Sequence, residues 1–168
     1  MENAESLQRI KAAHNGSELL DAGAREKIDQ LSKQRYEPLY DFLIKCLDDP
    51  NPGWREKSLA KIHYFKSKIN ETVLAKVREI ALTDPNIEVR VRACGTLGNI
   101  SKWPEDALNK VIKQETEPFV LGAATSSILL LRGVPPYIAL EQFNKISTEG
   151  VQPSSDYIEK VILDRIKT

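Results

Sequence analysis

The stretch from residue 84 to residue 98 reads DPNIEVRVRACGTLG. Asp84 or Asn86 can cap a helix here, because a short side-chain oxygen accepts a hydrogen bond from the free N–H groups of a first helical turn. Pro85 suits the same region, since the N–H group that it lacks would have no partner there. Apolar and small residues then recur at steps of three and four: Ile87, Val91, Cys94, Leu97 and Gly98. This spacing predicts an amphipathic helix that begins just after the proline.

Two other segments of the chain open in a similar way. Pro50 and Pro118 each follow an acidic residue, and they lie 35 residues before and 33 residues after Pro85. Each proline precedes a segment of helical periodicity, a short break and a second such segment. A period in the thirties that consists of helix pairs is typical of a helical solenoid, in which neighbouring pairs bury one continuous core. In the third pair we expect the second helix to face inward with Ile138, Leu140, Phe143 and Ile146.

The segments on either side of these pairs also have helical periodicity. Three lie before them, at residues 6–13, 17–34 and 38–47, and a helix capped by Ser154 or Ser155 follows. We expect one domain that spans residues 1–168, with N-terminal capping helices in 1–35, repeats in 36–147 and a C-terminal capping helix in 148–168. Terminal units of a solenoid must cover its apolar edges. No segment alternates as a strand would, so we predict an all-α fold.

The segment 84–98 resembles the repeats of the HEAT family, particularly the short bacterial kind, with its Asp-Pro, Val-Arg, Ala-small and Leu-Gly pairs. The family pattern places an arginine six residues after the aspartate of the turn. Asp84 and Arg90 match this pattern, and so do Asp49 and Arg55. The resemblance implies a right-handed α–α superhelix and a hydrogen-bonded ladder of these four residues between neighbouring repeats. A guanidinium group satisfied by carboxylates can be buried in this way.

The third pair departs from the family pattern at both positions. Glu117 stands in place of the aspartate, and Ala123 stands where the arginine belongs. We expect either that the ladder ends before this pair or that the pair is a degenerate end repeat. The resemblance covers residues 36–147, and the two ends are included by extension.

Composition excludes several classes of protein. The chain has 168 residues, 41% of them hydrophobic, and its 24 lysines and arginines balance 24 aspartates and glutamates. A net charge of zero argues against a globally basic nucleic-acid-binding protein. No run of about 18 apolar residues occurs, so we expect no membrane span. Residues 1–5 are acidic and do not resemble a secretory signal, so we expect a cytoplasmic protein.

The cysteines and histidines do not predict a metal centre. Cys46 and Cys94 lie within apolar helical segments, where we expect buried, free thiols in a reducing compartment. His14 and His63 have no second ligand at metal-binding spacing, and a zinc site needs three or four ligands in one constellation. We therefore predict no metal ion.

The sequence also contains no recognisable catalytic motif. It lacks a nucleophile elbow, a phosphate-binding loop and a cysteine–histidine pair. Gly95 and Gly98 lie within a predicted helix with no strand before it, so we expect them to allow close helix approach instead of binding phosphate. We predict neither enzyme activity nor a cofactor.

The second helices of HEAT-like pairs line the concave surface, so their outward side chains are the predicted partner-binding residues. The predicted set is Lys76, Glu79, Lys110, Lys113, Gln142 and Lys145. The four lysines could form a basic stripe. Because Glu79, Asp106 and Glu141 lie among them, a solvated face of mixed charge is the favoured interpretation.

Two tryptophans near the predicted turns are candidates for partner anchors. A large aromatic side chain at such a place can dominate a binding energy, and Trp103 is included in the predicted partner-binding set for this reason. The favoured alternative is that Trp54 and Trp103 each fill an edge between repeats and bond the indole N–H to a carbonyl.

The function expected from these patterns is a non-catalytic scaffold that binds a protein or peptide and is a monomer or weak homodimer. One alternative is an accessory subunit of an enzyme, as in HEAT-like proteins that help attach bilin chromophores. Another is weak nucleic-acid binding, as in HEAT-like base-excision proteins. The sequence does not favour nucleic-acid binding, because phosphate recognition needs several uncancelled cations on one face.

Overall fold

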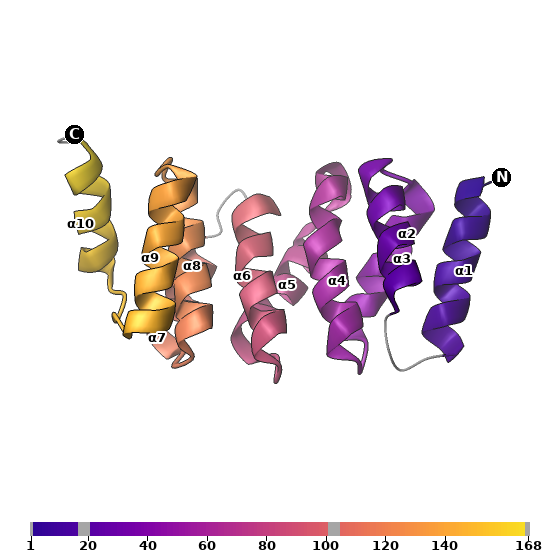
Figure 1. Ribbon diagram of the computed structural model, residues 1–168, viewed down its shortest axis with the longest axis horizontal. Helices are drawn as coiled ribbons and strands as arrows, with labels where there is room; N and C mark the ends of the chain where they lie inside the picture. Colours follow the sequence, from indigo (N-terminus) through magenta and orange to yellow (C-terminus); the bar gives the residue numbers. More distant parts are fainter. Residues whose placement is uncertain (1, 17–20, 101–104, 167–168) are drawn as a thin grey trace. The chain divides into compact units, whose positions relative to one another are not determined.

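The computed structural model describes residues 2–16, 21–100 and 105–166, and within them every regular element is a helix (Figure 1). The all-α prediction is confirmed for this part of the chain. The helices form two compact units, Met1–Val73 and Leu74–Thr168, called the N-terminal unit and the C-terminal unit below. A single domain over the whole chain stays a prediction. None of the described helices combines the length and the apolar character needed to cross a membrane.

The N-terminal unit consists of short helices around a small apolar core. Its elements are α1 (Glu2–Gly16), α2 (Ala22–Lys33), α3 (Glu37–Lys45), the 3-10 helix η1 (Cys46–Asp48), α4 (Pro52–Ile62) and the 3-10 segment η2 (His63–Lys68). Helix α1 packs on α2, and α4 packs on α2, α3 and η1. Asn51 caps α4 because its side-chain oxygen accepts from the N–H of Gly53 at 2.8 Å.

Helix α5 (Glu71–Thr83) begins in the N-terminal unit and continues into the C-terminal unit. It is followed by α6 (Ile87–Ile100), α7 (Glu105–Gln114), α8 (Pro118–Leu131), α9 (Pro136–Glu149) and α10 (Ser155–Ile166). Helix α8 packs on α6, α7, α9 and α10, and nine of its residues are buried. The C-terminal unit is therefore assembled around α8, the most apolar of its helices.

Most of the predicted helix ends are observed. Asn86, and not Asp84, caps α6, because its side-chain oxygen accepts from the N–H of Val89 at 3.1 Å. Ser154 caps α10 by accepting from the N–H of Tyr157 at 3.1 Å. Gly133 ends the α8 segment with a φ of 75°, a left-handed conformation that favours glycine.

The two glycines of α6 differ in their surroundings. A Cβ atom on Gly98 would lie 3.1 Å from the Cβ of Ser127 on α8, so the predicted close approach is confirmed there. A Cβ atom on Gly95 would meet nothing within 4 Å, so the same prediction is wrong for that residue. Only one of the two therefore contributes to helix packing.

Candidate protein-binding surface and its supporting turns

The turns that precede α4, α6 and α8 share one hydrogen-bonding pattern. In each, a carboxylate accepts from the backbone N–H two residues later. The three pairs are Asp49 with Asn51 at 2.8 Å, Asp84 with Asn86 at 2.9 Å, and Glu115 with Glu117 at 3.0 Å. This bond closes a tight turn and directs the chain into the helix that follows.

The third of these turns corrects the sequence-based alignment. The acidic residue that occupies the aspartate position is Glu115, not Glu117, and Glu117 is the residue just before helix α8. Pro118 therefore corresponds to Pro52, which also opens a helix, and not to Pro85. The alignment by prolines failed because the chain uses proline at two different positions of the turn. Six residues after Glu115 stands Leu121, which is 2% exposed, in place of an arginine.

The arginines of the first two turns bond to the backbone of their own turn. Arg55 donates from Nη1 to the carbonyls of Asp49 at 2.7 Å and Pro50 at 3.0 Å, and its side chain is buried. Arg90 donates in the same way to the carbonyl of Asp84 at 2.8 Å. In each turn, the carboxylate therefore accepts from a backbone N–H group, and the arginine donates to a backbone carbonyl. A ladder that joins Asp49, Arg55, Asp84 and Arg90 across repeats stays a prediction.

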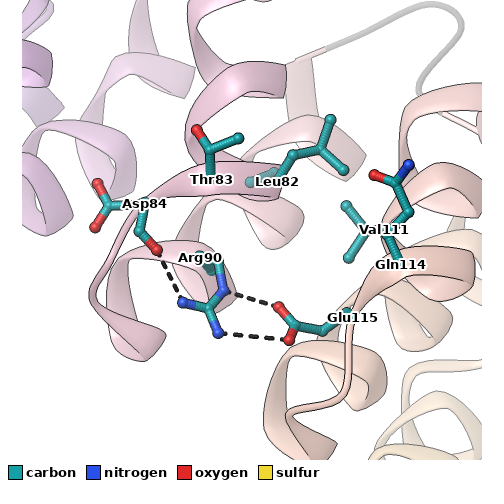
Figure 2. A pocket seen from close by; sticks show the side chains of 8 residues that line it. Leu82, Thr83, Asp84, Arg90, Val111, Gln114 and Glu115 are labelled. Carbon is teal, nitrogen blue, oxygen red and sulfur yellow. Dashed lines mark hydrogen bonds and ion pairs between the residues drawn. The ribbon is translucent and has the colours of Figure 1, made fainter.

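Arg90 also reaches the turn before α8, and Arg90 and Glu115 both line a cavity of about 220 Å³ (Figure 2). Its Nε donates to Glu115 at 2.8 Å, and both side chains are 12% exposed. Burial raises the pKa of the Glu115 carboxyl, but bonds from the N–H of Glu117, from Arg90 and from the N–H of Thr116 outweigh it, so that the pKa is lowered. Arg90 and Glu115, two of the charged residues that line this cavity, are thus bonded to each other, which is the arrangement of a structural junction.

The exposed large apolar side chains of the described residues all lie in the C-terminal unit. They are Ile87, Phe119, Leu130, Leu131, Tyr137, Leu140 and Leu163. Tyr137 is 72% exposed and Leu140 is 59% exposed, and because they lie three residues apart on α9 they share a face. The expectation that Leu140 faces inward is therefore wrong. Ala139, Gln142 and Ile146 are the buried positions of α9.

Helix α10 brings a further apolar side chain to this region. The Tyr157 hydroxyl of α10 donates to the side-chain oxygen of Gln142, so α10 lies beside α9. The two helices run in opposite directions (Figure 1). Tyr137 lies near the start of α9, and Leu163 lies near the end of α10. Leu163 is 54% exposed. We call Tyr137, Leu140 and Leu163 the α9–α10 surface.

The predicted partner-binding lysines differ in their surroundings: two form ion pairs within their own helix, and two are exposed on α7. Lys76 pairs with Glu79 at 3.3 Å on α5, and Lys145 pairs with Glu141 at 2.6 Å on α9. Lys110 and Lys113 are exposed on α7. Trp103 lies outside the described residues. Two of the four lysines of the expected basic stripe are therefore neutralised by neighbours on their own helix.

Gln142 corrects the prediction of an outward side chain. It is 7% exposed and accepts a hydrogen bond from Tyr157. The periodicity of α9 places Gln142 outward, whereas α10 covers the part of α9 that carries this residue. This residue holds two helices together and is not available to a partner.

Trp54 is buried in the N-terminal unit. Its side chain is 1% exposed and packs edge-on against Phe42 and His14, with ring centroids 5.9 and 4.9 Å apart. The preference for a space-filling role is confirmed, but the expected bond to a carbonyl is not, because Nε1 has no hydrogen-bond partner among the described residues.

The fold also brings His14 to Cys46 and Asp49. One ligand atom from each of the three lies within 4.8 Å of the others. Sequence spacing could not reveal this cluster, because His14 is 32 and 35 residues away from the other two. Both Cys46 and Cys94 are buried and free, as predicted.

Comparison with known proteins does not assign a family. A scan against protein-family models found no match, and neither did searches of curated proteins and of solved structures.

Proposed function

We propose that this protein is a HEAT-like, right-handed helical-repeat scaffold that binds a protein partner without catalysis, through the α9–α10 surface. The observation that carries the proposal is the exposure of Tyr137 and Leu140 on one face of α9, together with the exposure of Leu163 on the neighbouring helix α10. Apolar groups gathered on a surface are typical of an interaction site. Tyrosine is also among the residues that most often dominate binding energies.

The repeated turn supports the HEAT-like part of the proposal. Three turns use the same carboxylate-to-amide bond, and two of them add an arginine six residues later that bonds to the turn carbonyl. Recurrence of one turn at three helix starts is what a repeat architecture predicts. In this framework α9 is the second helix of the third pair, which is the kind of helix that the resemblance assigns to partner binding.

The distribution of charge favours a protein partner over nucleic acid. Lys76 and Lys145 each pair with a glutamate on the same helix. Phosphate binding depends on cations whose charge is not cancelled nearby. The α9–α10 surface offers apolar area, which a folded partner or an amphipathic peptide helix can cover.

The test compares two double variants. Tyr137→Ser/Leu140→Ser removes the apolar side chains of α9, and Glu26→Ala/Gln30→Ala removes an exposed hydrogen-bonded pair on α2 as the control. Both should leave the free energy of unfolding within about 0.5 kcal/mol, because the side chains are solvent-exposed. Partners captured from an extract of the source organism by the wild-type protein are identified by mass spectrometry, and their affinities are then measured with purified proteins.

We expect the apolar variant to weaken partner affinity by about 30-fold or more, as for loss of a binding hot spot of about 2 kcal/mol. The control should bind within about twofold. Equal loss in both variants, or no partner retained at moderate salt, would contradict the proposal. A steep salt dependence in a DNA or RNA shift assay, lost in Lys110→Glu, would favour nucleic-acid binding instead.

A further inference from the structure

Three side chains of the N-terminal unit bring a nitrogen, a sulfur and an oxygen atom together. His14 lies in the last turn of α1, Cys46 begins η1, and Asp49 follows η1. One ligand atom of each lies within 4.8 Å of the other two. Cys46 is 2% exposed, and the Asp49 side chain is 9% exposed. Two segments of the chain, the end of α1 and residues 46–49, therefore converge on one nearly enclosed point.

The three groups are held in place by their neighbours. Asp49 uses Oδ1 to accept from the N–H of Asn51, which leaves Oδ2 against Nε2 of His14. The His14 ring stands edge-on to Phe42 and Trp54, at interplanar angles of 87°. Ligands whose orientation is set by such outer contacts need little reorganisation to bind an ion.

One buried donor near this cluster lacks a hydrogen-bond partner among the described residues. It is the indole Nε1 of Trp54, whose ring packs on His14 and whose side chain is 1% exposed. Buried polar groups are almost always satisfied by protein or water. A hydrogen-bond acceptor such as water therefore fits in this part of the unit.

We propose that His14, Cys46 and Asp49 bind one divalent transition-metal ion of the zinc class, with a fourth position open to an exchangeable ligand. Imidazole, thiolate and carboxylate are the three ligand types that zinc takes in proteins, and three protein ligands with one open position are typical of its reactive sites. A thiolate and a carboxylate also cancel the charge of a divalent ion, which lowers the free-energy cost of burying that ion. The His14 side chain is 28% exposed, so an ion from solvent can reach the three ligands beside this residue.

Metal binding at this site must release a proton. Because a thiolate and not a thiol binds the ion, the buried Cys46 side chain gives its proton to solvent on binding, and affinity rises as the pH rises. The same ion would fasten α1 to η1 and to the turn before α4, so that binding also stabilises the N-terminal unit.

The experiment uses the full-length, tag-free, reduced and metal-free protein titrated with Co²⁺ as a spectroscopic probe. We expect one equivalent to bind with a near-ultraviolet thiolate-to-cobalt charge-transfer band, and Zn²⁺ to displace it. Zn²⁺ should also raise the midpoint of thermal unfolding, and the proton released on binding should be measurable in weakly buffered solution.

Four variants identify the ligands. Cys46→Ser should abolish the charge-transfer band, and His14→Ala and Asp49→Asn should each weaken Zn²⁺ binding by tenfold or more. Cys94→Ser is the matched control, since Cys94 is the other buried free cysteine and lies in the C-terminal unit. It should keep both the band and the affinity. Circular dichroism of each metal-free variant shows whether it retains the helical fold.

Two results would overturn the proposal. One is the absence of a charge-transfer band at saturating Co²⁺ in the folded wild-type protein. The other is a band that survives Cys46→Ser or disappears equally in Cys94→Ser. If His14→Ala lowers stability to the same extent with and without Zn²⁺, the cluster is a histidine–aspartate ion pair only, and the metal site is refuted. None of these outcomes depends on the α9–α10 surface.

Discussion

The turn before α4 and the turn before α6 share their local bonds but differ in what they hold. Both close with a carboxylate-to-amide bond and an arginine bonded to the turn carbonyl. In the first, Asp49 adds a bond to His14 of α1. In the second, Arg90 adds an ion pair with Glu115 of the turn before α8. The shared bonds therefore define where a helix begins, and the additional partner selects which other segment is fastened to that turn.

The residue five positions after each turn aspartate shows a second difference. It is Trp54 in the first case and Val89 in the second, and their side chains are 1% and 0% exposed. The turn before α8 has Val120 at this position, also 0% exposed. One buried position thus accommodates a tryptophan or a valine, depending on how much space the neighbouring helices leave.

The largest expected effect comes from Trp54→Ala. Deletion of a buried tryptophan leaves a large cavity and should cost about 3–5 kcal/mol. Val89→Ala, at the matching position, should cost about 2 kcal/mol, because it removes only two buried carbon atoms at about 0.8 kcal/mol each plus a cavity term. Urea denaturation monitored by circular dichroism measures both. Equal losses would show that the two positions are not equivalent in packing.

The Arg90–Glu115 pair provides the second effect. Arg90→Ala should lower the free energy of unfolding by roughly 2–4 kcal/mol, because it leaves Glu115 nearly buried without its cation. A double-mutant cycle with Glu115→Gln should give a coupling energy of about 0.5–3 kcal/mol. The exposed Glu88 on the same helix supplies the control, and Glu88→Gln should be additive with Arg90→Ala. Additivity in both cycles would mean that the ion pair does not join the two turns.

The sequence was sufficient to predict the helical nature of the fold. Residues 84–98 alone contain the cap, the proline and the apolar spacing of α6, and the observed helix is Ile87–Ile100. These signals are local, since a cap acts within one turn and periodicity acts along one helix. The alignment of the third turn failed for the same reason. A proline indicates that a helix begins nearby, but it does not indicate which position of the turn the proline occupies. The bond from the N–H of Glu117 to Glu115 identifies the acidic residue of the third turn, and thereby the position of Pro118.

The candidate sites depend on contacts between distant segments, which periodicity does not contain. The periodicity of α9 predicts an outward Gln142, because nothing in α9 itself indicates that Tyr157 of α10 bonds to it. His14 meets Asp49 across 35 residues of sequence. The exposure of Leu140 follows from which face of α9 packs on α8, and a helix with apolar residues on several sides leaves that choice open.

The pH dependence of stability should differ between the two units. Burial raises the pKa of the Glu115 carboxyl, but backbone N–H donors and Arg90 lower it more, so that the pKa lies below its ordinary value of 4.5. Burial likewise raises the pKa of Asp29, but Lys57 and Lys61 lower it below its ordinary value of 3.8. A carboxylate with a lowered pKa stabilises the fold above its unfolded-state pKa, and this contribution disappears as the pH falls through the folded-state value.

The stability difference between wild type and Glu115→Gln should therefore shrink as the pH falls below about 4.5, and that for Asp29→Asn should shrink at a lower pH, below about 3.8. Thermal unfolding midpoints between pH 7 and pH 3 measure both differences. If the Glu115→Gln difference is constant over this range, the Glu115 carboxylate does not gain from its partners in the folded state.

The smallest expected effect comes from the position at which α4 has Ala60 and α6 has Gly95, each 11 residues after the turn aspartate. Gly95→Ala gives α6 the residue that α4 already has. Because the added Cβ meets nothing within 4 Å, the variant should gain about 0.5–1 kcal/mol from the lower backbone entropy of the unfolded chain. Gly122→Ala in α8 is the contrasting control: its Cβ would lie 3.0 Å from the Phe143 ring and 3.1 Å from the Phe143 carbonyl oxygen, so this variant should be destabilised. Destabilisation by Gly95→Ala would show that α6 needs a glycine where α4 does not, and that the two helices are less alike than their turns.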